Sequence, residues 1–175
     1  MNLQFENYII RNFIDDDVDS LYKYANNINV SQYLRESFPY PYSKQNALEW
    51  IYFIKQDSDK LALAIADEHE LIGGIGAIPN NDVHRFTAEI GFWLGEPFWN
   101  KGIMTKAIRV FCNYLFDAYN YNKLSANVFE GNEASKKVLQ NTGFILEGIL
   151  IKNIFKKNKF MDQYIYGLLK EEFRR

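Results

Sequence analysis

The chain has 175 residues and a formal net charge of −2, with 47% hydrophobic, 24% charged and 17% aromatic residues. This composition is typical of a folded protein of ordinary domain size and excludes a disordered chain. The small negative charge provides no general basic surface for nucleic acid, and no apolar run reaches the roughly 18 residues that a membrane-spanning helix needs. The N-terminus also lacks a basic region followed by an apolar one, so the sequence predicts a cytoplasmic protein.

Neither internal repeats nor linkers divide the chain, which is therefore expected to form a single domain over residues 1–175, as a monomer or a homodimer. The only cysteine, Cys112, excludes an internal disulfide and falls in a predicted helix, where a buried and inert thiol is expected. The two histidines, His69 and His84, lie in predicted turns. This scatter gives no metal-ligand spacing, so we expect no metal and no acyl-cysteine.

The first part of the chain predicts a strand over residues 8–13 and then a helix to about Asn27, capped by the acidic triplet 15–17. Residues 30–42 are broken by two prolines and predict a loop or short helical turns. A helix is expected over residues 44–56, capped by Ser43. Four apolar residues recur there at helical spacing and predict core packing: Ala47, Trp50, Ile51 and Ile54.

Two strands, over residues 60–67 and 71–78, are separated by a three-residue connection that predicts an antiparallel hairpin. The second strand contains Gly73, Gly74 and Gly76. Because no helix follows these glycines, close backbone packing or a bulge explains them better than a phosphate-binding loop. Residues 79–86 are polar and predict a loop.

A strand over residues 87–94, a loop containing Gly102 and a helix over residues 105–119 follow in order. A strand, a glycine-containing loop and a helix start make the geometry that binds phosphate, because the first amides of a helix lack internal partners and its dipole makes that end positive. Taken alone, an ordinary turn from strand to helix is an equally good interpretation of this segment.

The last part of the chain predicts a strand over residues 123–129 and a helix over residues 132–141, capped by Asn132 and ended by Gly143 in a left-handed conformation. Residues 145–157 and 160–169 predict a final antiparallel pair.

Three segments together carry a family resemblance. Residues 99–107 resemble motif A of the GNAT N-acetyltransferases, the loop that cradles the pyrophosphate of acetyl-CoA, and residues 132–135, 138–144 and 147–148 resemble motif B. Residues 38–42, followed by the helix with Trp50 and Ile51, are similar to the branch of ribosomal-protein N-terminal acetyltransferases typified by RimJ and RimL. The resemblance extends over residues 8–169, with the motifs in the family's order.

The resemblance implies an α/β (α+β) GNAT fold, in which a mixed, mostly antiparallel sheet of about seven strands is flanked by helices. The fourth and fifth predicted strands would splay apart to hold acetyl-CoA, with the pantetheine arm between them and the pyrophosphate on the amides of residues 100–105. The cofactor-binding residues implied in this way are Phe92, Trp93, Leu94, Asn100, Lys101, Gly102, Ile103, Met104, Thr105, Asn127, Asn132 and Ser135.

Glu89 is the candidate base that accepts the proton of the substrate ammonium, directly or through water. It shares one face of its strand with Thr87 and Gly91, where partial burial would favour proton uptake by a carboxylate. The alternative is a polar residue on the outer face of a half-buried strand.

Ser135 is the candidate that donates a proton to the departing sulfur, and Asn132 would hold the pantetheine amide or the adjacent loop. Many GNAT enzymes have a tyrosine acid seven residues after this asparagine, where this chain has Leu139; the RimJ/RimL-like branch, with a serine three residues after the asparagine, fits better. Ser135 could equally be a local capping hydroxyl. Asn127 is a further candidate, to polarise the thioester or to order a water.

The motif A loop departs from the common family pattern at three residues. Met104 replaces a small residue, and Trp99 replaces Gln or Arg. Lys106 stands where the branch commonly has Glu, which is expected to make the phosphate end more positive. None of these changes removes a backbone donor, so binding of acetyl-CoA is expected.

The identity of the amine acceptor stays open in the sequence. Phe38, Tyr40 and Tyr42 lie in a region that covers the acceptor pocket in GNAT enzymes, with core packing as the alternative for each. The acceptor classes are a protein N-terminal α-amine and a small-molecule amine, such as a polyamine held by carboxylates like Glu36 and Glu49. A CoA-binding protein without catalysis is the other class of function.

Overall fold

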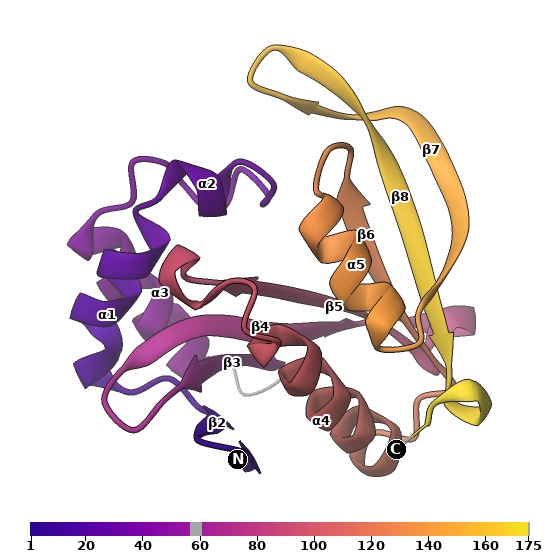
Figure 1. Cartoon of the computed structure of the whole chain (residues 1–175), viewed down its shortest axis with the longest axis horizontal. Helices are drawn as coiled ribbons and strands as arrows, with labels where there is room; N and C mark the ends of the chain where they lie inside the picture. Colours follow the sequence, from indigo (N-terminus) through magenta and orange to yellow (C-terminus); the bar gives the residue numbers. More distant parts are fainter. Residues whose placement is uncertain (57–60, 175) are drawn as a thin grey trace. The chain divides into compact units, whose positions relative to one another are not determined.

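The computed structural model describes residues 1–56 and 61–174 of the chain. Its described residues form one sheet of eight strands in the order β1-β2-β3-β4-β5-β6-β8-β7 (Figure 1). Only β5 and β6 pair in parallel among the registers established for this part of the chain. The strands and α-helices are β1 (Asn2–Phe5), β2 (Tyr8–Arg11), α1 (Val18–Ala25), α2 (Ile28–Ser31), α3 (Lys44–Gln56), β3 (Leu61–Ala66), β4 (Leu71–Pro79), β5 (Thr87–Leu94), α4 (Ile103–Ala118), β6 (Lys123–Phe129), α5 (Glu133–Asn141), β7 (Ile145–Lys156) and β8 (Lys159–Leu169).

The mixed, mostly antiparallel sheet is confirmed, and its eighth strand is β1, which the sequence did not predict. β1 pairs antiparallel with β2 through the two-residue connection Glu6 and Asn7, and Glu6 has a left-handed φ of 48°. Tight hairpins of this kind usually carry Asn-Gly or Asp-Gly at the turn. A four-residue strand followed by Glu-Asn has no such signature, so the pattern gave no indication of a hairpin.

The predicted hairpin of β3 and β4 is confirmed within the described residues; Lys60, which the prediction included, lies outside them. Its glycines allow close packing, as expected. A Cβ atom at Gly73 would lie 2.5 Å from the Trp93 carbonyl oxygen, and one at Gly74 would lie 2.6 Å from Trp93 Nε1. The side chain and backbone of Trp93 therefore occupy space that only glycine leaves free.

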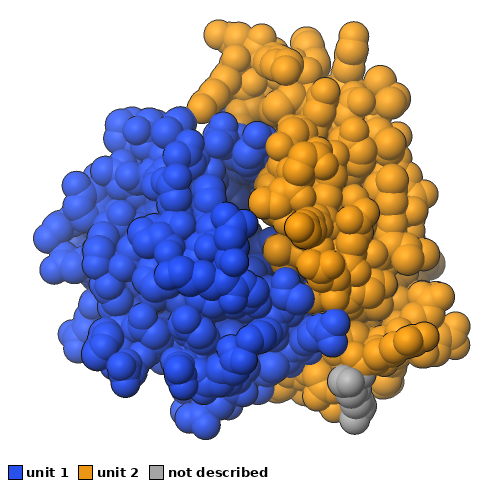
Figure 2. All heavy atoms as spheres, in the orientation of Figure 1, with its two compact units in different colours: residues 1–77, 92–110 blue, residues 78–91, 111–175 orange. Residues whose placement is uncertain are grey.

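The chain divides into two compact units, shown in different colours in Figure 2. Unit 1 comprises residues 1–77 and 92–110, and unit 2 comprises residues 78–91 and 111–175. The core of unit 1 joins α1 and α3 to β3 and β4. Its buried residues are Phe13, Leu21, Ala25, Tyr42, Ala47, Ile51, Ala64 and Leu71.

Helix α3 begins with a reciprocal cap, as the serine before it predicts. The Asn46 amide donates to Ser43 Oγ, and the Ser43 amide donates to Asn46 Oδ1. Ala47 and Ile51 are buried and Ile54 packs against the core, which confirms three of the four predicted core residues. The prediction for Trp50 was wrong: its side chain is 39% exposed and lies beside Phe53, because the buried stripe runs through positions 47, 51 and 54 and leaves Trp50 at its margin.

Unit 2 buries every second residue of β6, in the pattern expected of a strand with one covered face. Helix α5 begins at the Asn132 cap, and Gly143 follows its end with a φ of 95°, as predicted. The Phe144 amide donates to the Leu139 carbonyl at 3.1 Å and closes the helix end. Cys112 is fully buried, and this burial raises the pKa of its thiol, so the reactive thiolate is disfavoured.

Glu70, at the turn between β3 and β4, links that turn to α1 and makes the stability of unit 1 depend on pH. Its Oε1 accepts from Lys23 Nζ at 2.7 Å and from the Tyr24 hydroxyl at 2.6 Å. Burial alone would raise the pKa of Glu70, but these two hydrogen bonds outweigh it and lower the pKa. Because the folded-state pKa is depressed, the contribution is present above the unfolded pKa and is lost as pH falls through the folded one.

Glu70→Gln is therefore expected to lower the free energy of unfolding by about 0.5–1 kcal/mol at neutral pH and to change it little in acid. Urea unfolding of both proteins at about pH 7 and pH 3 measures this difference. A loss of equal size at the two pH values would show that the Glu70 carboxylate charge is not its source.

Candidate functional site

Side-chain hydrogen bonds fix the first part of the connection from β5 to α4. Trp99 Nε1 donates to the Leu94 carbonyl at 2.7 Å, which ties the start of the loop back to the end of β5. Within the same loop, the Glu96 carboxylate accepts from the side-chain amides of Asn27 and Asn29 at 2.6 and 3.0 Å. Trp99 therefore has a structural role in place of the Gln or Arg that often begins this motif.

The loop then turns into α4 through two residues with left-handed backbone, Asn100 at a φ of 60° and Gly102 at a φ of 73°. A Cβ atom at Gly102 would meet no heavy atom within 4 Å, so the backbone there faces open space. The hydrogen bond from the Lys106 amide to the Gly102 carbonyl, 3.2 Å long, closes the first helical turn. The amides of residues 103–105 precede that bond and have no acceptor within the helix.

The helix begins at Ile103, two residues before the predicted start, and the side chains of Ile103 and Met104 are buried. These two side chains anchor the first turn in unit 1 and leave its amides at the open end of the helix. Met104 thus fills a core position, which explains why a large residue is accommodated there. Free amides, a positive helix end and an open glycine together fit the oxyanions of a pyrophosphate.

Two lysines border this loop. Lys101 Nζ lies 5.7 Å from the centroid of the Phe98 ring. Lys106 Nζ forms an ion pair with the Glu6 carboxylate at the β1–β2 turn. The positive charge that Lys106 was expected to add to the phosphate end is therefore opposed by a negative one.

The cofactor candidate Trp93 and the acceptor candidate Phe38 lie in contact in unit 1. The Trp93 ring packs edge-on against Phe38, with centroids 5.5 Å apart, and Phe38 lies 5.2 Å from the Tyr42 ring. Trp93 and Phe92 are half-buried, and Leu94 is buried at the end of β5. The structure thus brings three of the predicted site residues, Trp93, Phe38 and Tyr42, together in one aromatic cluster.

The three acceptor candidates differ sharply in exposure. Tyr42 belongs to the core of unit 1, where its side chain is 5% exposed and burial raises the pKa of its hydroxyl to about 12. Phe38 packs against that core and is partly buried, whereas Tyr40 is 50% exposed. Core packing therefore accounts for Tyr42 without an acceptor.

Glu89 is half-buried in unit 2, on β5 and opposite Ser125 of β6. The paired register of these two parallel strands covers Thr87/Lys123, Ala88/Leu124 and Glu89/Ser125. Ser125 Oγ donates to the Ala88 carbonyl at 3.4 Å. Glu89 thus lies where the ladder of β5 and β6 ends, in the partly desolvated setting that the strand pattern predicts.

Ser135 and Asn132 are joined at the start of α5. The Ser135 backbone amide donates to Asn132 Oδ1 at 3.1 Å, so the side-chain oxygen of Asn132 caps the helix. Within residues 1–56 and 61–174, no hydrogen-bond partner is found for the half-buried Ser135 hydroxyl, which leaves it able to donate elsewhere. Asn127 is half-buried on β6, opposite Ile165 of β8.

Lys136, which sequence reasoning did not single out, follows Ser135 directly. Its ammonium contacts Glu133 at 2.8 Å and lies 3.6 Å from the centroid of the Tyr164 ring. Burial disfavours its charge, but the hydrogen bond to Glu133 and the nearby charges outweigh burial and raise the pKa of Lys136. A positive charge is therefore held near the start of α5 by Glu133 and Tyr164. A lysine in the first turn of a helix gives no sequence signal for such contacts.

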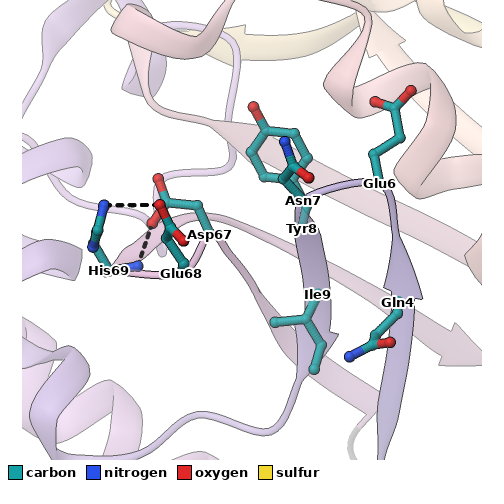
Figure 3. Close-up of a pocket in the computed structure, with 8 residues that line it drawn as sticks. All are labelled: Gln4, Glu6, Asn7, Tyr8, Ile9, Asp67, Glu68 and His69. Atoms are coloured by element: carbon teal, nitrogen blue, oxygen red, sulfur yellow. Dashed lines mark hydrogen bonds and ion pairs between the residues drawn. The ribbon is translucent and has the colours of Figure 1, made fainter.

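A shallow hollow of about 610 Å³ opens elsewhere in unit 1, at the β1–β2 and β3–β4 turns (Figure 3). It shares no residue with the predicted site; its lining residues are Gln4, Glu6, Asn7, Tyr8, Ile9, Asp67, Glu68 and His69. Within the described part of the chain, no group of three or more His, Cys, Asp or Glu residues could hold a metal ion. None of the described helices combines the length and apolarity needed to cross a bilayer.

Comparison with known proteins places these features in a family. The family model described as "Acetyltransferase (GNAT) domain" matches residues 7–145. An N-acetyltransferase of Bacillus subtilis (strain 168), YnaD, whose own activity is uncharacterised, is 29% identical over 174 residues, with 99% of each chain covered. The ribosomal-protein-serine acetyltransferase of Escherichia coli (strain K12) is 26% identical over 139 residues, covering 70% of this chain and 77% of that protein.

A solved structure of RimL, a ribosomal α-N-protein acetyltransferase in complex with coenzyme A, superimposes with a TM-score of 0.84. It covers 97% of this chain and 98% of RimL at 18% sequence identity. At 18% identity, this structural similarity shows the fold alone.

Proposed function

This chain belongs to the acetyltransferase (GNAT) family, and on that premise we propose that it transfers the acetyl group of acetyl-CoA directly to the N-terminal α-amine of a protein. The family match runs through both units, which supports the proposal that residues 1–175 work as one catalytic domain. We propose that the reaction takes place in the cytoplasm, as the sequence predicts.

The observation that carries the proposal is the turn from β5 into α4. Asn100 and Gly102 have left-handed backbone, and a Cβ atom at Gly102 would meet no heavy atom within 4 Å. The amides of residues 103–105 follow directly, at the positive end of a 16-residue helix. We propose that these amides hold the pyrophosphate of acetyl-CoA. When bound, acetyl-CoA supplies an acetyl thioester, whose carbonyl carbon an amine can attack.

The residues of unit 2 are proposed to move the protons. Glu89 accepts a proton from the substrate ammonium, which frees the nitrogen lone pair for attack on the thioester carbonyl. A C–N bond forms, the C–S bond breaks, and Ser135 Oγ donates its proton to the departing sulfur. After the C–N bond forms, the nitrogen loses its second proton, which returns to Ser135 through solvent, and Glu89 releases the first proton to solvent. The net products are an amide, the CoA thiol and one proton.

The choice of a protein acceptor is supported by the relatives, because the Escherichia coli protein matched over 70% of this chain is named for a ribosomal protein. A polyamine would need converging carboxylates. The two carboxylates considered for that role are both exposed, and Glu49 already accepts from Gln45 Nε2 at 2.9 Å. A small-molecule amine therefore has less support in the structure.

Release of CoA thiol, measured across N-terminal peptides, polyamines, amino acids and amino sugars, tests the acceptor class. Strong release with peptides alone is expected. A polyamine or amino sugar as the best acceptor would replace the protein acceptor, and binding of acetyl-CoA without release on any acceptor would favour a CoA-binding protein.

Ser135→Ala is expected to lower kcat by roughly 10²-fold, because the sulfur would lose its proton donor, with little change in stability. Ser43→Ala is the matched control, since Ser43 caps α3 through its hydroxyl. It is expected to lower the free energy of unfolding by about 1 kcal/mol and to leave kcat unchanged. If Ser135→Ala behaves like Ser43→Ala, Ser135 is only a local structural hydroxyl.

A further inference from the structure

The ion pair between Glu6 and Lys106 joins the start of α4, where the phosphates of acetyl-CoA are proposed to bind, to the hairpin of β1 and β2. Lys106 lies in the first turn of α4, directly after Thr105, at the helix end where the phosphates of acetyl-CoA are proposed to bind. Its contact is with Glu6 at the turn of the β1–β2 hairpin. Both partners lie in unit 1.

Glu6 is set apart from the other carboxylates near this turn. The dashed contacts in Figure 3 join His69 to Asp67 and to Glu68, while the Glu6 side chain lies apart from them. The register of β1 and β2 and the left-handed φ of Glu6 fix the position of its backbone, from which the side chain extends. The Glu6 carboxylate therefore pairs with Lys106 and takes no part in the contacts of Asp67 and Glu68.

The family match begins at residue 7, so β1 and Glu6 lie outside it. Lys106 also departs from the Glu that the RimJ/RimL-like branch commonly has at this position. The chain thus pairs a lysine inside the family motif with a carboxylate from a segment that the family match does not include.

We propose that Glu6 is a positioning residue that holds the Lys106 ammonium away from the phosphates of acetyl-CoA and so weakens donor binding. The inference rests on the proposed function, because it requires acetyl-CoA at this loop. The Lys106 and Glu6 side chains are 46% and 54% exposed, so solvent screens the pair and either side chain can move at small cost. Lys106 is therefore free to turn toward an anion once Glu6 no longer holds it.

The sign of each substitution follows from charge. Glu6→Gln removes a negative charge near the anion and releases Lys106, and both effects strengthen binding of acetyl-CoA. Lys106→Gln removes the only cation of the pair and leaves the Glu6 carboxylate behind, which weakens binding. A purely structural role of the pair predicts instead that both substitutions weaken binding.

Titration calorimetry of acetyl-CoA into each variant tests the proposal without an acceptor. Glu6→Gln is expected to lower the dissociation constant by about two- to fivefold at low salt, and Lys106→Gln is expected to raise it by a similar factor. Both differences are expected to shrink at about 1 M salt, where the Debye length is about 3 Å. Asp15→Asn is the matched control, because Asp15 forms another exposed ion pair in unit 1, with Lys55, and should change nothing.

A dissociation constant that is unchanged or raised in Glu6→Gln, with wild-type binding intact, would overturn the role of Glu6 and leave the proposed function standing. Failure of the wild type to bind acetyl-CoA would overturn the proposed function, and the role of Glu6 with it. Opposite shifts for the two variants, lost at high salt, would establish the role.

Discussion

Glu89→Gln is expected to lower kcat by about 10²- to 10⁴-fold, while the dissociation constant for acetyl-CoA stays within about twofold of the wild type. The substitution keeps the size and hydrogen-bonding shape of the side chain and removes its ability to take up a proton. Without that base the substrate amine would remain an ammonium, which cannot attack a thioester. Steady-state rates of thiol release with saturating peptide provide the measurement.

Glu130→Gln is the matched control for that substitution. Glu130 follows β6 in the same unit, is exposed, and accepts from the Asp162 amide at 3.1 Å through an oxygen that glutamine retains. Its replacement should leave kcat unchanged. A Glu89→Gln enzyme with more than about a third of wild-type kcat would show that another group, or water alone, removes the proton.

Gly102→Ala is expected to raise the dissociation constant for acetyl-CoA by roughly 10- to 100-fold, the cost of disrupting one or two charge-assisted hydrogen bonds. The new methyl group would project into the open space beside the loop, where the pyrophosphate is proposed to lie. Its backbone would also be strained, since a φ of 73° disfavours residues with a Cβ. Titration of acetyl-CoA measures the affinity, and urea unfolding measures the strain.

Gly143→Ala separates these two effects. Gly143 also has a left-handed φ, of 95°, but it ends helix α5, and a Cβ there would make only an ordinary contact with Leu168. Its replacement should cost about 1–2 kcal/mol of stability and leave acetyl-CoA affinity unchanged. An equal loss of affinity in both variants would mean that strain, not the space beside Gly102, controls binding.

Much of the fold could be predicted because its elements carry strong local signals. β5 and β6 begin and end at the predicted residues, and α5 begins at a capping asparagine and ends before a left-handed glycine. The turn from β5 into α4, which we propose to bind phosphate, was predicted in the same way, since a strand, a glycine and a helix start leave a recognisable pattern. These features depend on neighbouring residues in the chain.

The features that were missed depend on residues far apart in the chain. Strand β1 is too short to show a period and its turn lacks a signature, so only its pairing with β2 defines it. Trp50 has the spacing of a core residue, but the direction from which the core covers α3 leaves it exposed. The partners of Lys106 and Lys136, namely Glu6 and Tyr164, likewise come from other strands or turns.

The most direct test of acetyl transfer by this protein is mass spectrometry of a peptide with a free N-terminal serine, incubated with the wild-type protein and acetyl-CoA. The peptide is expected to gain one acetyl group on its α-amine, in step with release of CoA thiol, and Glu89→Gln is expected to abolish most of this acetylation. A peptide that stays unmodified, while the same protein binds acetyl-CoA and acetylates a small-molecule amine, would contradict the proposed acceptor. No transfer to any amine would contradict the catalytic roles of Glu89 and Ser135.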